Sequence, residues 1–115
     1  MRKIALLFLV FFFAVLYAVA WAHPPKDITI TYDPATKILK AVIVHDVSNP
    51  AKHFIKTVDV SLNGKEIIGH LISRQDNNDT QTVAYLIPDA LAGDTLAVEG
   101  HCNISGKLEK SIKIQ

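Results

Sequence analysis

Short runs of alternating apolar and polar residues, separated by turn residues, fill the sequence from residue 23 onward and constrain its fold most strongly. Successive side chains of a strand point to opposite faces, so a period of two indicates strands with one buried face. Seven such runs are expected, at 28–32, 38–45, 54–62, 65–72, 80–87, 95–101 and 108–114. Seven short strands predict an all-β fold, an antiparallel β-sandwich of immunoglobulin-like type.

Two turns between these runs have recognisable chemistry. Asp33-Pro34-Ala35-Thr36 follows the first run, and its proline fixes φ at the second turn position. Asn63-Gly64 separates the third and fourth runs, and both residue types tolerate a positive φ. The first segment therefore predicts a turn, and Asn63-Gly64 predicts that the runs on either side of it pair as a hairpin.

The first 22 residues have a different pattern from the rest. An unbroken apolar run from Ile4 to Ala20 follows Met1-Arg2-Lys3, and Ala20-Trp21-Ala22 supplies small residues at a cleavage site. This pattern predicts a secretory signal peptide at 1–22 and a periplasmic or secreted domain at 23–115. The run also approaches the length of about 20 residues that spans a bilayer. An uncleaved anchor is therefore the alternative, and this segment is the one expected membrane contact.

Composition excludes several classes of function for the domain. Removal of the signal peptide would leave 93 residues, of which ten are basic and eleven acidic. That near-neutral balance, without a basic block, argues against binding to nucleic acid. A single cysteine, Cys102, allows no internal disulfide. Nucleophile-elbow, phosphate-loop and paired-carboxylate motifs are absent from the sequence, so no catalytic residue is assigned.

The residues that could carry chemistry are histidines and the cysteine. Most of them stand at expected strand ends, where the loops of a sandwich bring distant segments together. The candidate metal ligands are Cys102, His53, His45, His101 and His23, and His70 is the weakest histidine because it lies within a strand. Imidazole and thiolate select iron, copper or zinc over calcium or magnesium. The alternative is that the histidines are ordinary surface residues and the cysteine a small buried apolar residue.

Two segments resemble the desulfoferrodoxin and superoxide reductase family. His53-Phe54-Ile55 is similar to a family segment whose histidine binds iron, and the segment from Cys102 to Gly106 (CNISG) is similar to the family motif CNxHG. The resemblance implies a seven-stranded immunoglobulin-like fold and a mononuclear non-heme iron that reduces superoxide to peroxide. It also implies an axial Cys102 ligand and a small redox protein as electron donor.

The sequence departs from that family at three ligand positions. Ser105 stands where CNxHG has its histidine, and Val47 stands six residues before His53, where the family has another. His45 lies eight residues before His53, and His23-Pro24 is the nearest match to the family's N-terminal ligand segment. A complete site would therefore need His45, His101 or His23 to substitute from shifted positions.

A second resemblance implies a different class of function. His53-Phe54-Ile55, Leu62-Asn63-Gly64-Lys65 and the segment 92–98 are similar to the Z subunit of the thiosulfate-oxidation carrier complex. That resemblance implies a non-catalytic module that binds another periplasmic protein. A third possibility follows from cleavage after Ala22, because the new amino group and imidazole of His23 could together chelate Cu(II).

Overall fold

The computed structural model describes residues 23–115, and every helix-or-strand element in that range is a β-strand. The expected signal peptide at 1–22 lies outside the described residues. Within residues 23–115 no helix is long and apolar enough to cross a membrane. The expectation of an all-β fold is confirmed.

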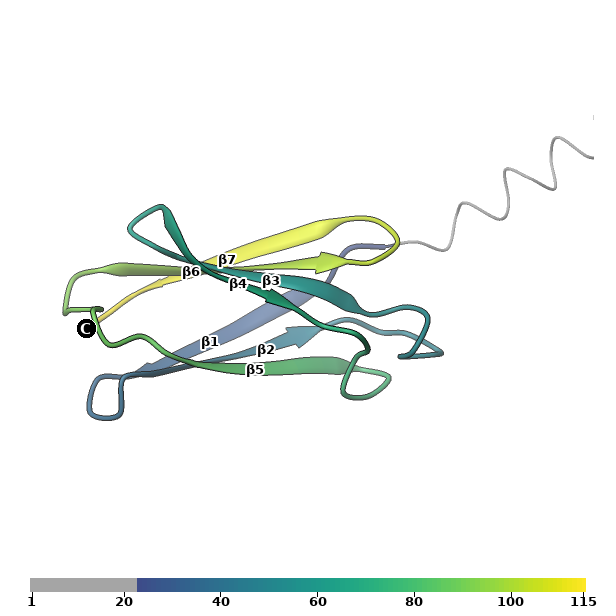
Figure 1. Cartoon of the computed structure of the whole chain (residues 1–115), viewed down its shortest axis with the longest axis horizontal. Coiled ribbons are helices and arrows are strands. Elements are labelled where there is room, and N and C mark those ends of the chain that lie inside the picture. The colour runs from purple at the N-terminus through teal and green to yellow at the C-terminus, as the bar shows by residue number, and fades with distance from the viewer. Residues whose placement is uncertain (1–22) are drawn as a thin grey trace, which may run out of the picture.

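Seven antiparallel strands form two sheets that pack face to face (Figure 1). The strands are β1 (Asp27–Asp33), β2 (Ile38–Val44), β3 (Ile55–Leu62), β4 (Lys65–Leu71), β5 (Thr80–Leu86), β6 (Thr95–Cys102) and β7 (Lys107–Lys113). The first sheet has the order β1-β2-β5 and the second the order β4-β3-β6-β7. All seven expected strands are therefore present, and no strand end differs from its expected position by more than one residue.

The strand order is that of an immunoglobulin-like sandwich in which the fourth strand pairs with the third. In a constant-type immunoglobulin domain the fourth strand belongs to the sheet of the first, second and fifth strands. Here β4 instead pairs along β3 through the Asn63-Gly64 turn, with partners from Leu62↔Lys65 to Thr57↔Leu71. The tight turn accounts for this choice, because it returns the chain directly beside β3.

Both predicted turns are present, and each connects two paired strands. Asn63 and Gly64 have φ angles of 51° and 83°, which is the backbone of a type I′ turn. In the turn between β1 and β2, Lys37 has a φ of 62° and its N–H donates to the carbonyl oxygen of Asp33 at 2.7 Å. These turns fix the register of the strands that they connect.

The core lies between the two sheets and is built from the inward residues of the alternating runs. Its completely buried members are Leu39, Ala41, Ile43, Ile55, Val58, Val60, Leu96 and Val98. Gly100 fits among them without a side chain, because a Cβ there would lie 3.2 Å from Ile43 Cδ1. The core holds the ends of β2 and β6 in fixed positions, and two of the candidate ligands, His45 and Cys102, lie at those ends.

Candidate metal centre

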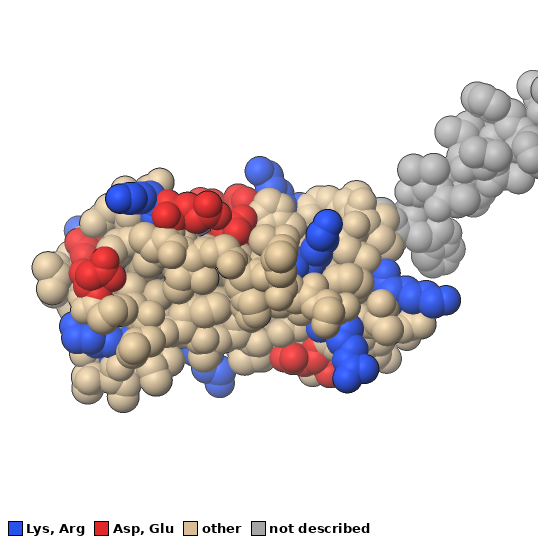
Figure 2. Space-filling view, viewed as in Figure 1, with Lys and Arg blue, Asp and Glu red and all other residues tan. Residues whose placement is uncertain are grey.

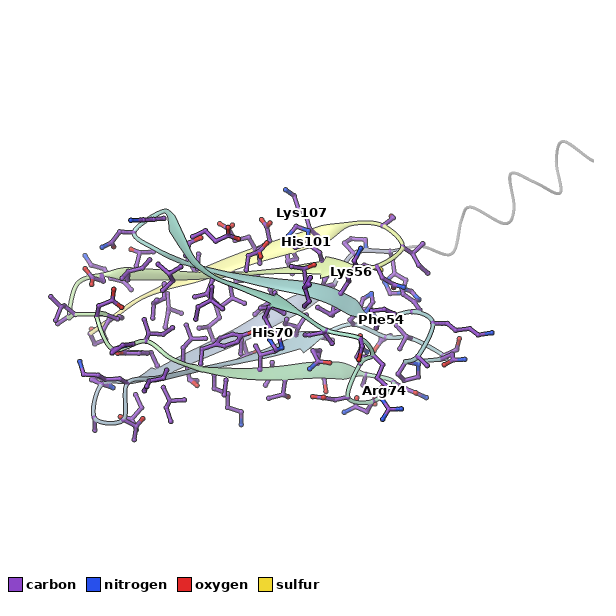
Figure 3. The ribbon with its side chains drawn as sticks, in the orientation of Figure 1. Phe54, Lys56, His70, Arg74, His101 and Lys107 are labelled. Carbon is purple, nitrogen blue, oxygen red and sulfur yellow. The ribbon has the colours of Figure 1, made fainter. Side chains whose placement is uncertain are left out.

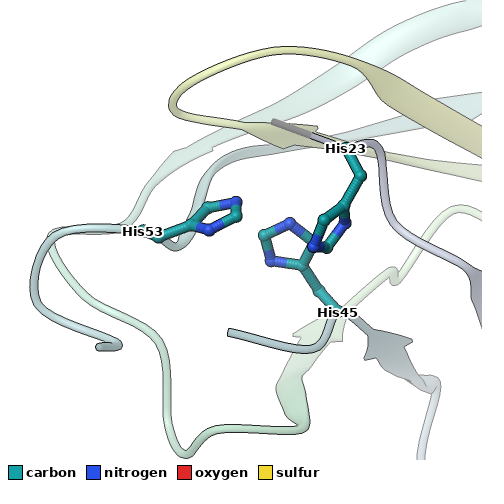
Figure 4. Close-up of side chains that lie close together, drawn as sticks. All are labelled: His23, His45 and His53. Carbon is teal, nitrogen blue, oxygen red and sulfur yellow. The ribbon is translucent and has the colours of Figure 1, made fainter. Parts of the chain in front are cut away.

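Three histidines from separate segments meet at one end of the sandwich (Figure 4). His23 precedes β1, His45 directly follows β2, and His53 lies in the loop before β3. Their ring centroids are 4.8–5.2 Å apart. One ring nitrogen of each lies within 4.8 Å of the other two. Two nitrogens on one metal ion at about 2.1 Å lie at most about 4.2 Å apart, so small side-chain rotations would bring this His triad to bonding distance.

His45 is the buried member of the triad, and its ring is oriented to act as a metal ligand. Its side chain has no exposed surface, and its Nδ1 lies 2.8 Å from Gln75 Oε1. Gln75 Nε2 donates to the carbonyl oxygens of His45 and Asn77, so Gln75 Oε1 must be the acceptor and His45 Nδ1 carries the hydrogen. The lone pair of a neutral His45 is therefore on Nε2.

That lone pair has no partner. In residues 23–115, His45 Nε2 is the one buried side-chain nitrogen or oxygen atom without a hydrogen bond. A buried polar atom left unpaired costs about 1–3 kcal/mol and calls for an explanation such as an ion. Metal-ligating histidines usually donate their other N–H to a fixed acceptor, as His45 does to Gln75. This arrangement identifies the triad as a candidate metal centre.

Cys102 lies against the triad through His53. His53 Nε2 is 3.1 Å from Cys102 Sγ, and the Ile104 N–H donates to the same sulfur at 3.4 Å. Cys102 is buried and is not one of the three clustered ligands. The sulfur of Cys102 is therefore in direct contact with a ring nitrogen of the triad.

Asn103 fixes the loop of His53 beside Cys102. Its side-chain oxygen accepts from the Phe54 N–H at 2.9 Å, and its amide nitrogen donates to the Lys52 carbonyl oxygen at 2.9 Å. Its own backbone N–H donates to the Phe54 carbonyl oxygen at 3.0 Å. Three hydrogen bonds on both sides of His53 therefore explain why this histidine and Cys102 meet.

His23 is positioned by contacts of the residues that follow it. The Lys26 N–H donates to the Val44 carbonyl oxygen at 2.8 Å, which extends the pairing of β1 with β2. Pro24 packs on Gly106 so closely that a Cβ at Gly106 would lie 2.7 Å from Pro24 Cβ. The turn after Cys102 therefore holds the N-terminal segment in place, and with it the His23 ring.

The triad opens to solvent through a hollow of about 620 Å³. The hollow is lined by His23, Asp46, Val47, Ser48, His53, Asn78 and Asp79. Asp46 forms an ion pair with Lys26, which lowers the pKa of that carboxyl below its ordinary value. A small solute can therefore reach His23 and His53, while His45 stays buried beneath them.

Burial lowers the pKa of His53, and the neighbouring rings of His45 and His23 lower it further. The ordinary histidine pKa is about 6.5, so the His53 ring is neutral over most of the physiological range. A neutral imidazole is the form that coordinates a metal. The surroundings of His53 therefore favour the neutral ring, which can bind a metal, over the protonated ring.

The remaining predicted residues lie elsewhere. His101 precedes Cys102 in β6, so its side chain points to the outer face of the sheet and contacts Asp59 and Glu99. His70, which is labelled in Figure 3, has its Nδ1 2.8 Å from the Tyr85 hydroxyl oxygen. Ser105 is exposed in the turn after β6. The structure thus brings together His23, His45 and His53, places Cys102 beside them, and does not bring His101 to the same place.

Sequence reasoning missed two residues that organise the site, Gln75 and Asn103. Gln75 stands in a polar loop, and Asn103 is the second residue of CNISG. Asn103 could have been found, because an asparagine next to a candidate ligand at a strand end is suited to bonding neighbouring backbone. No pattern in the sequence marks Gln75 as the partner of a histidine 30 residues earlier.

Comparison with known proteins does not assign the chain to a family. No protein-family model matches the sequence, and no curated protein matches it. Evidence on function therefore comes from the residues of the site itself.

Proposed function

We propose that this domain binds a single transition-metal ion through His23, His45 and His53. The observation that carries the proposal is the buried, unpaired Nε2 of His45, whose tautomer is fixed by Gln75 and which lies within a cluster of three histidines. Three imidazoles suit zinc, copper and iron, and the open side of the site leaves room for a further ligand. Cys102 supplies a sulfur donor at the edge of this site.

We further propose that the metal is iron and that its chemistry is superoxide reduction. Iron in the reduced state would supply the single electron that, with two protons, converts superoxide to hydrogen peroxide. This proposal is supported by the contact of Cys102 with His53 and by the resemblance of both segments to superoxide reductases. The residues present offer four donors, since Ser105 brings no imidazole to the site.

This chain's own side chains would perform three tasks in that reaction. Gln75 holds His45 in the ligating tautomer, and Asn103 holds His53 beside Cys102. Lys26 neutralises Asp46 at the mouth of the hollow, which reduces the repulsion that an anion would meet there. Electrons would come from a small redox protein docking near this end of the sandwich.

Metal analysis of protein purified without oxygen tests the first proposal. We expect the His triad to hold close to one metal ion per chain, and we expect His45→Ala and His53→Ala to lower the metal content by that amount. His70→Ala is the matched control, because it removes a histidine that bonds Tyr85 outside the triad. Metal content that is zero after reconstitution, or equal in all three variants, would contradict the proposal.

A spectroscopic experiment separates metal binding from the iron–sulfur chemistry. Co²⁺ or Fe³⁺ bound by a thiolate gives a charge-transfer band, and we expect that band in the wild-type chain and its loss in Cys102→Ser. With a chemical reductant present, superoxide should be consumed by the chain that shows the band and not by the variant that lacks it. If the protein binds metal but shows neither the band nor superoxide consumption, the proposed metal centre stands and the superoxide proposal is overturned.

Copper is a second candidate metal, favoured by the presence of His23 in the triad. If the signal peptide is removed after Ala22, the amino group of His23 becomes an additional nitrogen donor. Cu²⁺ affinity should then fall when one residue is added before His23, while Zn²⁺ affinity for the imidazoles changes less. Equal Cu²⁺ affinity for the two chains would exclude a role for the amino group.

A further inference from the structure

A second group of potential metal ligands lies on the outer face of the four-stranded sheet. His101 Nε2 is 2.7 Å from Glu99 Oε1 and 3.1 Å from Asp59 Oδ2. One ligand atom from each of the three side chains lies within 4.8 Å of the other two. His101 and Lys107 are labelled beside this face in Figure 3. We call these three residues the outer cluster.

The register of the sheet brings like charges into direct opposition at the outer cluster. Asp59 of β3 pairs with Glu99 of β6, and Glu99 pairs in turn with Glu109 of β7. Figure 2 shows acidic side chains gathered over this sheet. Like charges directly opposite on adjacent strands destabilise a sheet. A row of three carboxylates therefore requires compensation by positive charge.

The compensation supplied by the protein is incomplete. Lys107 Nζ is 4.0 Å from Glu99 Oε1, and His101 offers one nitrogen to two carboxylates. A single imidazole N–H cannot point well at two acceptors. Glu66 adds a fourth carboxyl group, and its hydrogen bond to Asp59 raises the pKa of Glu66. Asp59 and Glu99 thus share one imidazole, and Glu99 has in addition a long contact with Lys107.

We propose that Asp59, Glu99 and His101 form a second metal site, which binds a divalent ion such as Zn²⁺ or Mn²⁺ independently of the His triad. An ion in place of the shared proton would contact two carboxylate oxygens and one imidazole nitrogen, a donor set that these ions accept. It would also neutralise the opposed charges of β3 and β6. These two strands are the central pair of their sheet, so the ligands are carried by a rigid frame.

The proposal is tested by metal binding in a chain whose first site has been removed. In His53→Ala, titration of Zn²⁺ followed by calorimetry should show one bound ion. A second change, His101→Gln or Asp59→Asn, should weaken that binding at least tenfold. NMR should show Zn²⁺ shifting the ring signals of His101 and the amide signals of Asp59 and Glu99.

Glu109→Gln is the matched control, because it removes a carboxylate from the same row that is not in the outer cluster. We expect its Zn²⁺ affinity to stay within about threefold of the parent. Equal weakening by Glu109→Gln and Asp59→Asn would show diffuse attraction to an acidic face and would overturn the site. Absence of bound Zn²⁺ and Mn²⁺ in His53→Ala would also overturn it, whatever the His triad binds.

Discussion

At the scale of single residues, the site depends on a pairing of one histidine with one amide. His45 is completely buried, and an isolated neutral imidazole could take either tautomer. Gln75 removes that freedom, because its own amide protons are already donated to two carbonyl groups. Hydrogen bonds of this kind raise the basicity of a ligating imidazole and fix its orientation. Gln75 is thus a positioning residue for the proposed metal.

The Gln75→Ala change tests this role. It removes the acceptor for His45 Nδ1, and we expect metal affinity to fall about 10–100-fold, the usual cost of losing such a partner. NMR of the ring nitrogens should show that the single Nδ1–H tautomer becomes a mixture. Chemical denaturation of the metal-free chain measures the separate cost to stability. Unchanged metal affinity in a folded variant would show that Gln75 does not position His45 for the metal.

His53 gives a prediction about pH. Burial lowers the pKa of His53 in the folded domain, whereas the unfolded chain has the ordinary value of about 6.5. Between these two values the unfolded chain binds more protons, so the contribution of His53 to stability is complete above about pH 6.5 and is lost as pH falls toward the folded pKa. NMR titration of the metal-free domain should place the His53 midpoint below 6.5. A midpoint at or above that value would contradict the prediction.

At the scale of elements, the turn that follows β6 connects three parts of the site. Cys102 ends the strand, Asn103 bonds the loop of His53, and Gly106 packs on Pro24 next to His23. The Cys102 N–H closes the turn by donating to the Gly106 carbonyl oxygen at 2.9 Å. One five-residue turn therefore sets the positions of two triad histidines and of the neighbouring sulfur.

Gly106→Ala should disturb this arrangement. Gly106 has a φ of 89°, and a Cβ there would also overlap Pro24, so the N-terminal segment must move. Gly93→Ala is a control for backbone strain alone, since Gly93 also has a φ of 89° and nothing lies within 4 Å of its Cβ position. Both changes should cost about 1 kcal/mol or more of stability. Metal affinity should fall in Gly106→Ala and not in Gly93→Ala, and equal affinities would show that Pro24 does not position His23.

At the scale of the whole molecule, the strands could be predicted and the site only partly so. Alternation and the Asn63-Gly64 turn determine the strands, because both are local consequences of side-chain direction and backbone angle. The meeting of His45 with His53 was also predictable from their positions at the two ends of one loop. The Gln75 contact and the separation of His101 from Cys102 depend on long-range packing and on which face each side chain takes. Because successive side chains of a strand point to opposite faces, the alternation in β6 already indicates that His101 and Cys102 lie on different faces.

Metal removal gives the last prediction, which concerns the stability of the entire domain. The triad joins the segment before β1, the end of β2 and the loop before β3, so an ion bound there would connect segments that separate on unfolding. Binding to the folded state alone adds about 2.7 kcal/mol when the free ion is at about 100 times its dissociation constant. For a domain of this size that corresponds to a rise in Tm of roughly 10 °C or more.

Thermal unfolding with excess Zn²⁺ and with a chelator should show this difference in the wild-type chain and in His70→Ala. The part of the rise due to the His triad should be absent in His53→Ala, and any rise that remains there should require His101. A Tm that is the same with metal and chelator in the wild-type chain would contradict binding at the triad.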